Sequence, residues 1–282
     1  MHKLKAIMIK DWHINKKSLL IPFWITAGFY VFILLSIAFA YFKGDMNINM
    51  IDLDTGPPVP VINYIVNMAI LGLPGLMSIL FIIMLTQNAL NEDIKKNCEL
   101  FHRSQPVSIW FRTGSKYLMG IAGNWAIMLI IALFNFLVIN TILAIFHQFD
   151  FYSAFNGMIL SSISFMKTGL IIGSITFFFS AVFKDKAFFQ GFAILLGVQF
   201  LFLIVNTMLN WNLPLPLTYL FKLIKLNPME GLENDVASLD IRNHISMVWN
   251  SILFNWKTLI QLAFSGSLFI GATWIYKNKE IK

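Results

Sequence analysis

The sequence predicts an all-α integral membrane protein with six transmembrane helices. Of the 282 residues, 57% are hydrophobic and only 12% are charged, whereas a soluble domain carries about 25% charged residues. Six apolar segments reach the roughly 20 residues that a helix needs to cross a bilayer. Lysine and arginine are concentrated in alternate connections between these segments. A polytopic helical protein accounts for all three observations.

The predicted spans belong to a single transmembrane domain that covers residues 1–282. The first apolar run is longer than the apolar core of a signal peptide, which has about 7–15 residues, so it is predicted to be retained. Gly72-Leu73-Pro74-Gly75 predicts a kink within the second span, because proline removes a helical hydrogen bond. The six spans cover roughly residues 19–42, 62–88, 117–146, 155–183, 187–209 and 252–276.

The distribution of basic residues predicts the orientation of the spans. Fifteen of the 21 lysines and arginines flank one set of span ends, in residues 1–18, 91–116, 184–186 and 277–282. Short loops rich in lysine and arginine stay in the cytoplasm. We therefore expect a multi-pass protein of the cell (plasma or inner) membrane with both termini cytoplasmic. The net charge of +7 is then explained by topology, and no nucleic-acid partner is predicted.

Several classes of site are excluded by the residues present. Cys98 is the only cysteine, so an intrachain disulfide cannot form. No His/Cys cluster has the spacing of a metal site, and no G-x-x-x-x-G-K-[ST] motif for nucleotide phosphates occurs. The spans contain no Ser/His or Asp/Asp pair that an intramembrane enzyme would need. We therefore predict no metal, no cofactor bound by this chain and no enzymatic activity of its own.

Residues 1–18 are predicted to form an interfacial helix. Leu4, Ile7, Met8 and Trp12 recur at helical spacing, and the lysines fall largely on the other side. A basic helix with one apolar stripe lies in the headgroup plane of a membrane. The alternative is a solvated basic tail that only orients the first span.

Residues 91–116 are a charged segment between the second and third predicted spans. Asn91 can cap a short helix, and Glu92 and Asp93 in its first turn suit the helix dipole. Pro106 ends this helix, because the residue before a proline is pushed out of helical geometry. The segment is much longer than a connection between two spans requires. It is therefore predicted to bind a polar protein partner, with a simple spacer as the alternative.

Residues 210–251 are predicted to form an outer segment before the last span. Pro214 and Pro216 separate it from the fifth span. The apolar run Leu217–Leu226 has ten residues and is too short to cross a bilayer. We expect a re-entrant or interfacial helix here, and the alternative is an irregular loop.

Polar residues inside the spans are candidates for a substrate pathway. Lys167 lies about 12 residues, or about 18 Å, from the outer end of its span. A charge at this depth costs about 2.5–3.5 kcal/mol on insertion, so Lys167 should face protein or water. It either attracts an anionic substrate group or holds two helices together. Gln199 and Asn206 in the fifth span either face a central path or form ordinary interhelical hydrogen bonds.

The charged segment contains the motif elements Glu92-Asp93, Glu99-Leu100, Pro106-Val107-Ser108 and Lys116. With these residues it resembles the intracellular loop of ABC-2 type exporter permeases (type V exporter fold). It extends to the layout of the chain, with an N-terminal interfacial helix, six spans and a long outer segment before the last span. One departure is Lys95-Lys96-Asn97-Cys98, which stands where the family has an Arg-Gly-Thr-type turn.

The resemblance implies a permease subunit of an ATP-driven exporter or flippase. Residues 91–111 would form a cytosolic coupling helix that docks on a separate ATPase subunit, which binds ATP and Mg. The permease would act as a dimer with a second copy or a paralogue, with Lys167, Gln199 and Asn206 along the substrate pathway. The alternative is a structural or sensory membrane protein without transport activity. The implied ATPase-coupling residues are Glu92, Asp93, Lys95, Lys96, Glu99, Leu100, Phe101, Arg103 and Pro106.

Overall fold

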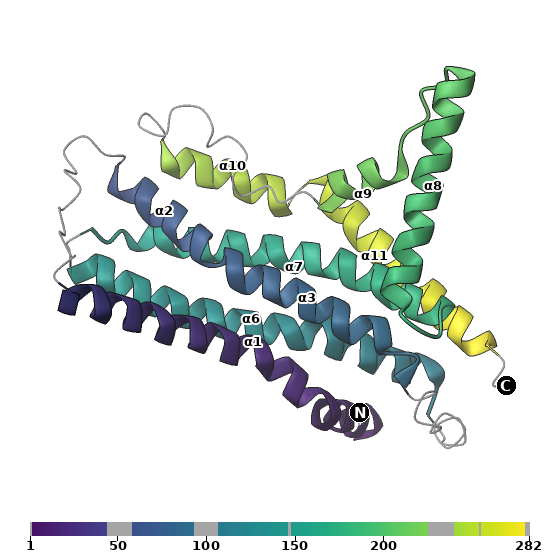
Figure 1. Ribbon diagram of the computed structural model, residues 1–282, viewed down its shortest axis with the longest axis horizontal. Helices are drawn as coiled ribbons and strands as arrows, with labels where there is room; N and C mark the ends of the chain where they lie inside the picture. Colours follow the sequence, from purple (N-terminus) through teal and green to yellow (C-terminus); the bar gives the residue numbers. More distant parts are fainter. Residues whose placement is uncertain are drawn as a thin grey trace.

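The computed structural model describes residues 2–43, 58–92, 107–145, 148–224, 240–253 and 255–279, and all regular structure in these ranges is helical (Figure 1). The predicted all-α class is therefore confirmed for the described part of the chain. The helices are α1 (His2–Lys43), α2 (Val59–Ile70), α3 (Gly72–Asn88), α6 (Ile109–Ile145), α7 (Phe151–Val182), α8 (Ala187–Leu209), α9 (Pro216–Ile224), α10 (Ile241–Leu253) and α11 (Trp256–Asn278).

Five helical segments of the described chain are long and apolar enough to cross a membrane. This number supports a polytopic membrane protein but differs from the six spans predicted. The first predicted span, residues 19–42, lies within α1 and is not among the five. The five segments are Val59–Asn88, Ile109–Ile145, Phe151–Val182, Ala187–Leu209 and Ile241–Asn278.

Helix α1 is one continuous helix of 42 residues, so it passes through the predicted boundary at residue 18 without interruption. Pro22 lies inside it, and Figure 1 shows that α1 changes direction along its length. A proline in a helix interior removes one backbone hydrogen bond and kinks the helix. The hydroxyl of Thr26 donates a hydrogen bond to the Pro22 carbonyl oxygen at 2.8 Å, one turn later.

The helix of the second predicted span is interrupted close to the position of the predicted kink. Helix α2 ends at Ile70, Leu71 forms a turn, and α3 begins at Gly72 with Pro74 in its first turn. Gly75 lies against the ring of Phe165 from α7, and a Cβ atom at this position would come within 2.5 Å of that ring. A larger residue at position 75 would therefore require the Phe165 ring to move.

Helix α7 is the central helix of the bundle and packs against α2, α3, α6, α10 and α11. Its small residues allow these close contacts. Gly157 approaches the backbone of Tyr64 in α2, and Gly169 and Gly173 both pack against Ile82 in α3. These two glycines, four residues apart on α7, thus allow close helix packing within one chain.

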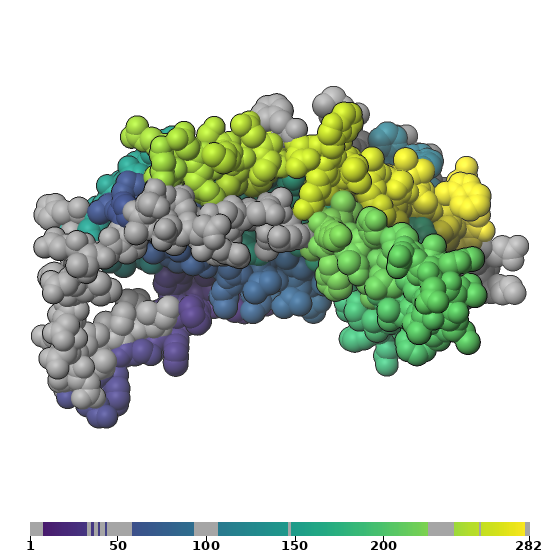
Figure 2. Space-filling view, turned by 90° about the horizontal axis from the view of Figure 1, so that it is seen from above, coloured from purple at the N-terminus to yellow at the C-terminus, as the bar shows by residue number. Residues whose placement is uncertain are grey.

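We call the end of the bundle where α3 ends and α6 begins the inner end, and the opposite end the outer end. Seen from above, α10 and α11 run one after the other along one face, with α8 and α9 beside α11 (Figure 2). Helix α10 packs its apolar residues on Val61, Tyr64 and Met68 of α2 and on Leu160 of α7. Helix α8 stands away from the bundle (Figure 1), and only Ala187 and Gly191 of its residues are buried.

Candidate functional site

The charged segment predicted to couple the chain to a partner begins and ends at the inner end. Its described parts are Asn91, Glu92 and the start of α6 from Val107. Glu92 is therefore the one predicted coupling residue whose position is described. The others, which lie outside the described residues, are Asp93, Lys95, Lys96, Glu99, Leu100, Phe101, Arg103 and Pro106.

The first end of this segment is bound to α7 through Asn91. The Asn91 side chain is only 2% exposed. Its amide nitrogen donates to the carbonyl oxygens of Ser180 at 2.9 Å and Phe183 at 2.6 Å. The last carbonyl groups of a helix lack partners inside it, so Asn91 caps the C-terminal end of α7. A displacement of the segment at Asn91 would therefore act directly on α7.

The second end of the segment is bound to α3 and α1 through the first turns of α6. The Lys116 ammonium donates to the Ala89 carbonyl oxygen at 2.7 Å. The Ser115 hydroxyl donates to the Asp11 carboxylate at 2.6 Å, and both side chains are at least 96% buried. Two neighbouring residues of α6 thus join three helices: Ser115 binds α1, and Lys116 binds the end of α3.

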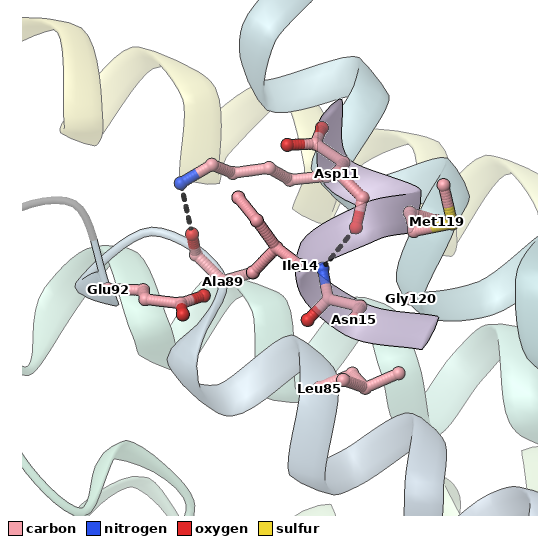
Figure 3. A pocket seen from close by; sticks show the side chains of 9 residues that line it. Asp11, Ile14, Asn15, Leu85, Ala89, Glu92, Met119 and Gly120 are labelled. Atoms are coloured by element: carbon pink, nitrogen blue, oxygen red, sulfur yellow. Dashed lines mark hydrogen bonds between the residues drawn. The ribbon is translucent and has the colours of Figure 1, made fainter. Parts of the chain in front are cut away.

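A small cavity lies between these three helices (Figure 3). Asp11 and Asn15 of α1 face Ala89 and Glu92 at the end of α3 across it. Its volume is about 30 Å³, which is room for one or two water molecules. The cavity is therefore too small for a transported molecule, and we interpret it as a polar joint between helices. It is lined by Asp11, Ile14, Asn15, Leu85, Ala89, Glu92, Lys116, Met119 and Gly120.

The buried bond between Asp11 and Ser115 leads to a stability prediction. Asp11→Ala leaves the buried Ser115 hydroxyl without its carboxyl acceptor, at an expected cost of about 1–3 kcal/mol. The melting temperatures of Asp11→Ala, Ser115→Ala and the double variant form a double-mutant cycle. We expect the double variant to lose clearly less stability than the two single losses added together. Additive losses would contradict a direct energetic link between these two residues.

Hydroxyl pairs near the inner end also link α6 to α7, α6 to α11 and α3 to α7. The Tyr117 and Ser174 hydroxyls join α6 to α7 at 2.6 Å, and the Thr113 and Thr273 hydroxyls join α6 to α11 at 3.1 Å. Thr86 of α3 is hydrogen bonded to Thr176 of α7. The four helices around the inner end are therefore connected by side chains as well as by apolar packing.

The chain after α11 is tied to the same end. The Lys279 ammonium donates to the Ala181 carbonyl oxygen at 3.0 Å, close to the carbonyl that Asn91 binds. Burial lowers the pKa of Lys279, and the nearby charge of Lys184 lowers it further. The end of α7 is thus held both by the start of the charged segment and by the end of α11.

Lys167, the predicted pathway residue, lies at the break between α10 and α11. Its ammonium donates to the Ile252 carbonyl oxygen at 3.0 Å and to the Thr258 hydroxyl at 2.8 Å. The Thr258 hydroxyl itself donates to the same Ile252 oxygen at 2.6 Å. A cation at the C-terminal end of a helix is favourable, because the last carbonyls carry partial negative charge. This geometry supports the alternative in which Lys167 holds helices together.

The end of α9 meets α7 one residue further along. The Thr168 hydroxyl donates to the Ile224 carbonyl oxygen at 3.3 Å, and the Gln261 amide of α11 donates to the Leu223 oxygen at 2.6 Å. The C-terminal ends of α9 and α10 are therefore both capped by polar side chains of α7 and α11. The sequence predicted Lys167 as a polar residue at depth, but not this shared capping site.

Gln199 and Asn206 are placed on α8, where they bind the returning chain. The Gln199 side-chain oxygen accepts from the Leu217 backbone N–H at 3.0 Å. The Asn206 side chain accepts from the Leu213 N–H at 2.9 Å and donates to its carbonyl oxygen at 2.8 Å. Both side chains fix the connection from α8 to α9. The structure therefore places these two side chains at the α8–α9 connection, whereas Lys167 binds the end of α10.

Comparisons with protein-family models, with curated proteins and with solved structures find no match for this chain. Within the described residues, no group of three or more His, Cys, Asp or Glu side chains could hold a metal ion.

Proposed function

We propose that this chain is the membrane-spanning permease subunit of an ATP-driven exporter or flippase. A separate cytosolic ATPase, which binds ATP and Mg, docks on the charged segment between α3 and α6. The chain itself carries no ATPase activity. It crosses the cell membrane six times, with α1 as the first span and with both termini in the cytoplasm.

The anchoring of the charged segment is the observation that carries this proposal. Asn91 binds the end of α7, and Lys116 binds the end of α3. Ser115 binds Asp11 in α1. A force applied by a partner to the segment would thus reach α1, α3, α6 and α7 through buried hydrogen bonds. A spacer would not need such attachments at both of its ends.

The exposed faces of α1 and α8 support a second permease copy or a paralogue as a further partner. Large apolar side chains on both helices are without cover in the single chain, among them Trp24 at 68% exposure and Phe189 at 69%. Membrane lipid can cover such faces, and so can another apolar helix. In the proposed dimer, α1 and α8 contact the second subunit and lipid covers the remaining apolar surface.

The substrate pathway is proposed to pass the capped ends of α9 and α10. Lys167 holds the α10 end, and Gln199 and Asn206 hold the α8–α9 connection. A change in these caps would move the two short helices relative to α7 and α11. In this proposal the three residues control the outer part of the pathway, and Lys167 offers a positive charge to an anionic group of the substrate.

Copurification tests the proposed partner. The tagged chain, extracted from its native membrane in a mild detergent, is expected to retain a cytosolic protein with a G-x-x-x-x-G-K-[ST] motif, identified by mass spectrometry. An untagged strain processed in parallel is the control. Recovery of the chain with no such ATPase, over several detergents, would favour the structural or sensory alternative.

The proposed orientation predicts a labelling pattern in intact cells. With Cys98 replaced by serine, cysteines introduced singly at Asp54 and Asn234 are expected to react with a membrane-impermeant maleimide. Native Cys98 in the parent chain is expected to react only after the membrane is permeabilised, because its segment is predicted to be cytoplasmic. Labelling of Cys98 from outside would contradict both the orientation and the ATPase docking site.

A further inference from the structure

Four lysines gather at the inner end, where the last residues of α7 and α11 meet the start of α8. Lys184 and Lys186 lie in the connection between α7 and α8, and Lys277 and Lys279 lie at the end of α11. Lys184, Lys186 and Lys277 are exposed, and Asp185 is the only acidic residue in 183–186 and 277–279. We call the four lysines the basic patch. It has a net positive charge that the proposed coupling does not use.

One contact brings the two halves of the basic patch together. The Lys279 ammonium donates to the Ala181 carbonyl oxygen at 3.0 Å, so the end of α11 lies against the last turn of α7. Burial lowers the pKa of Lys279, and the charge of Lys184 lowers it further, because the two cations are close enough to repel each other. An anion bound beside these two lysines would replace the repulsion with attraction.

The basic patch lies at the edge of the apolar part of the bundle. Of the candidate spans, one ends at Val182, one begins at Ala187 and one ends at Asn278. Each of the four lysines is within two residues of one of these points, which is about 3 Å along a helix. The headgroup layer on each side of a bilayer is about 5–7 Å thick. The exposed ammonium groups therefore reach the level of lipid phosphates as they stand.

One face of α11 combines a lysine of the patch with exposed apolar side chains. Ile270, Trp274 and Lys277 recur at helical spacing and therefore share this face. Ile270 is 57% exposed and Trp274 is 62% exposed. Tryptophan is enriched at the boundary between membrane and water. An acyl chain can lie along Ile270 and Trp274 while its headgroup is at Lys277, which favours a lipid over a soluble anion or an acidic protein surface.

We propose that the basic patch binds the phosphate of an anionic phospholipid. Lysines beside a membrane attract anionic headgroups, and each one strengthens binding about fivefold. The bound phosphate lies between the α7–α8 connection and the end of α11. It thereby stabilises the end of α7, to which the charged segment is bound through Asn91.

Lipid binding by the purified full chain, with its copurifying subunits, tests this proposal. The protein is titrated with phosphatidylglycerol or phosphatidylcholine in mild detergent, bound lipid is counted by native mass spectrometry, and the melting temperature is recorded. We expect phosphatidylglycerol to raise the melting temperature by several degrees and phosphatidylcholine to leave it unchanged. Lys184→Gln/Lys186→Gln is expected to weaken phosphatidylglycerol binding by roughly tenfold or more, and Lys277→Gln about fivefold.

The matched control is Lys16→Gln/Lys17→Gln, which also removes two neighbouring exposed lysines. These two residues lie on α1 next to Asn15, which lines the cavity at the inner end. This variant is expected to bind phosphatidylglycerol as the parent does. Equal weakening in both double variants would mean a general attraction between cations and anionic lipid and would overturn the proposal. So would a parent chain that binds both lipids equally.

The melting temperature without anionic lipid separates binding from a structural role. Lys184→Gln/Lys186→Gln is then expected to melt at or above the temperature of the parent, because it removes the charge that repels Lys279. A lower melting temperature would assign these two lysines a structural role. Equal stabilisation of the parent by inorganic phosphate would assign the patch to a soluble anion. Loss of the copurifying subunits at unchanged lipid binding would assign it to an acidic protein surface. Each of these three results would overturn the proposal.

Discussion

Lys167→Met is expected to lower the melting temperature of the purified protein by several degrees. The substitution removes the donor to the Ile252 carbonyl and the Thr258 hydroxyl, at the point where α10 ends. The Ile252 carbonyl oxygen keeps the hydrogen bond that it accepts from the Thr258 hydroxyl, so the expected cost is that of the two bonds donated by the ammonium, about 1–3 kcal/mol. Insertion into the membrane is expected to remain intact or improve, because a charge is removed from the middle of a span.

The matched control for this variant is Lys222→Met, which changes an exposed lysine of α9. It is expected to leave the melting temperature nearly unchanged. If Lys167→Met and Lys222→Met lower the melting temperature equally, the cap on the end of α10 does not depend on Lys167. Transport measured on Lys167→Met tests the pathway proposal separately, since normal transport would exclude an essential role of this charge in the path.

Charge reversal at Glu92 and Asp93 is expected to reduce ATPase copurification at least tenfold while the chain still inserts. Exposed charges usually change stability by less than about 0.5 kcal/mol, but they decide which surfaces are complementary. Glu92 also lines the cavity with Lys116, so its reversal places two cations at one joint. Asp93→Lys alone is therefore included to separate docking from packing.

Asp185→Lys is the matched control for the charge reversal. It reverses an exposed carboxylate in the hairpin between α7 and α8, on the same predicted side of the membrane. This variant is expected to copurify with the ATPase at the parent level. Normal copurification and normal transport of the Glu92/Asp93 double reversal would exclude both residues from the docking surface.

The helix boundaries were predictable where local chemistry interrupts an apolar run. The fifth span was predicted at residues 187–209, and α8 covers Ala187–Leu209. It begins after the charged Lys184–Lys186 turn, and Asn210 after it has a left-handed conformation that ends the helix. The interruption at Leu71 was predictable for a similar reason, because Pro74 cannot donate a backbone hydrogen bond.

Helix α10 was not predicted, because its sequence is too polar for a span. Its buried residues Ile241, Ile245, Val248 and Ile252 recur at helical spacing and could have indicated an amphipathic helix. The predicted last span began at residue 252, whereas α11 begins at Trp256 after Asn255, whose side chain accepts from the Lys257 N–H. The asparagine cap was the missed signal for this boundary.

The contacts of the candidate site could be predicted only in part. The depth of Lys167 followed from the length of its span. Its partners could not be predicted, because one of them is the backbone carbonyl of Ile252, and every residue type has such a group. Asp11 and Ser115 are 104 residues apart, and Asn91 binds carbonyls nearly as distant in the sequence. No local pattern relates such residues, so only the packed helices reveal that both ends of the charged segment are anchored.

Crosslinking from the charged segment tests the central claim most directly. A photoreactive amino acid replaces Lys96 in the native membrane, and a second chain carries it at Asp235 in the predicted outer segment. We expect the probe at position 96 to capture a cytosolic protein with a nucleotide-binding G-x-x-x-x-G-K-[ST] motif, and the probe at position 235 to capture none. Capture of the ATPase from position 235, or no ATPase captured from position 96 in a chain that reaches the membrane, would contradict the proposed permease.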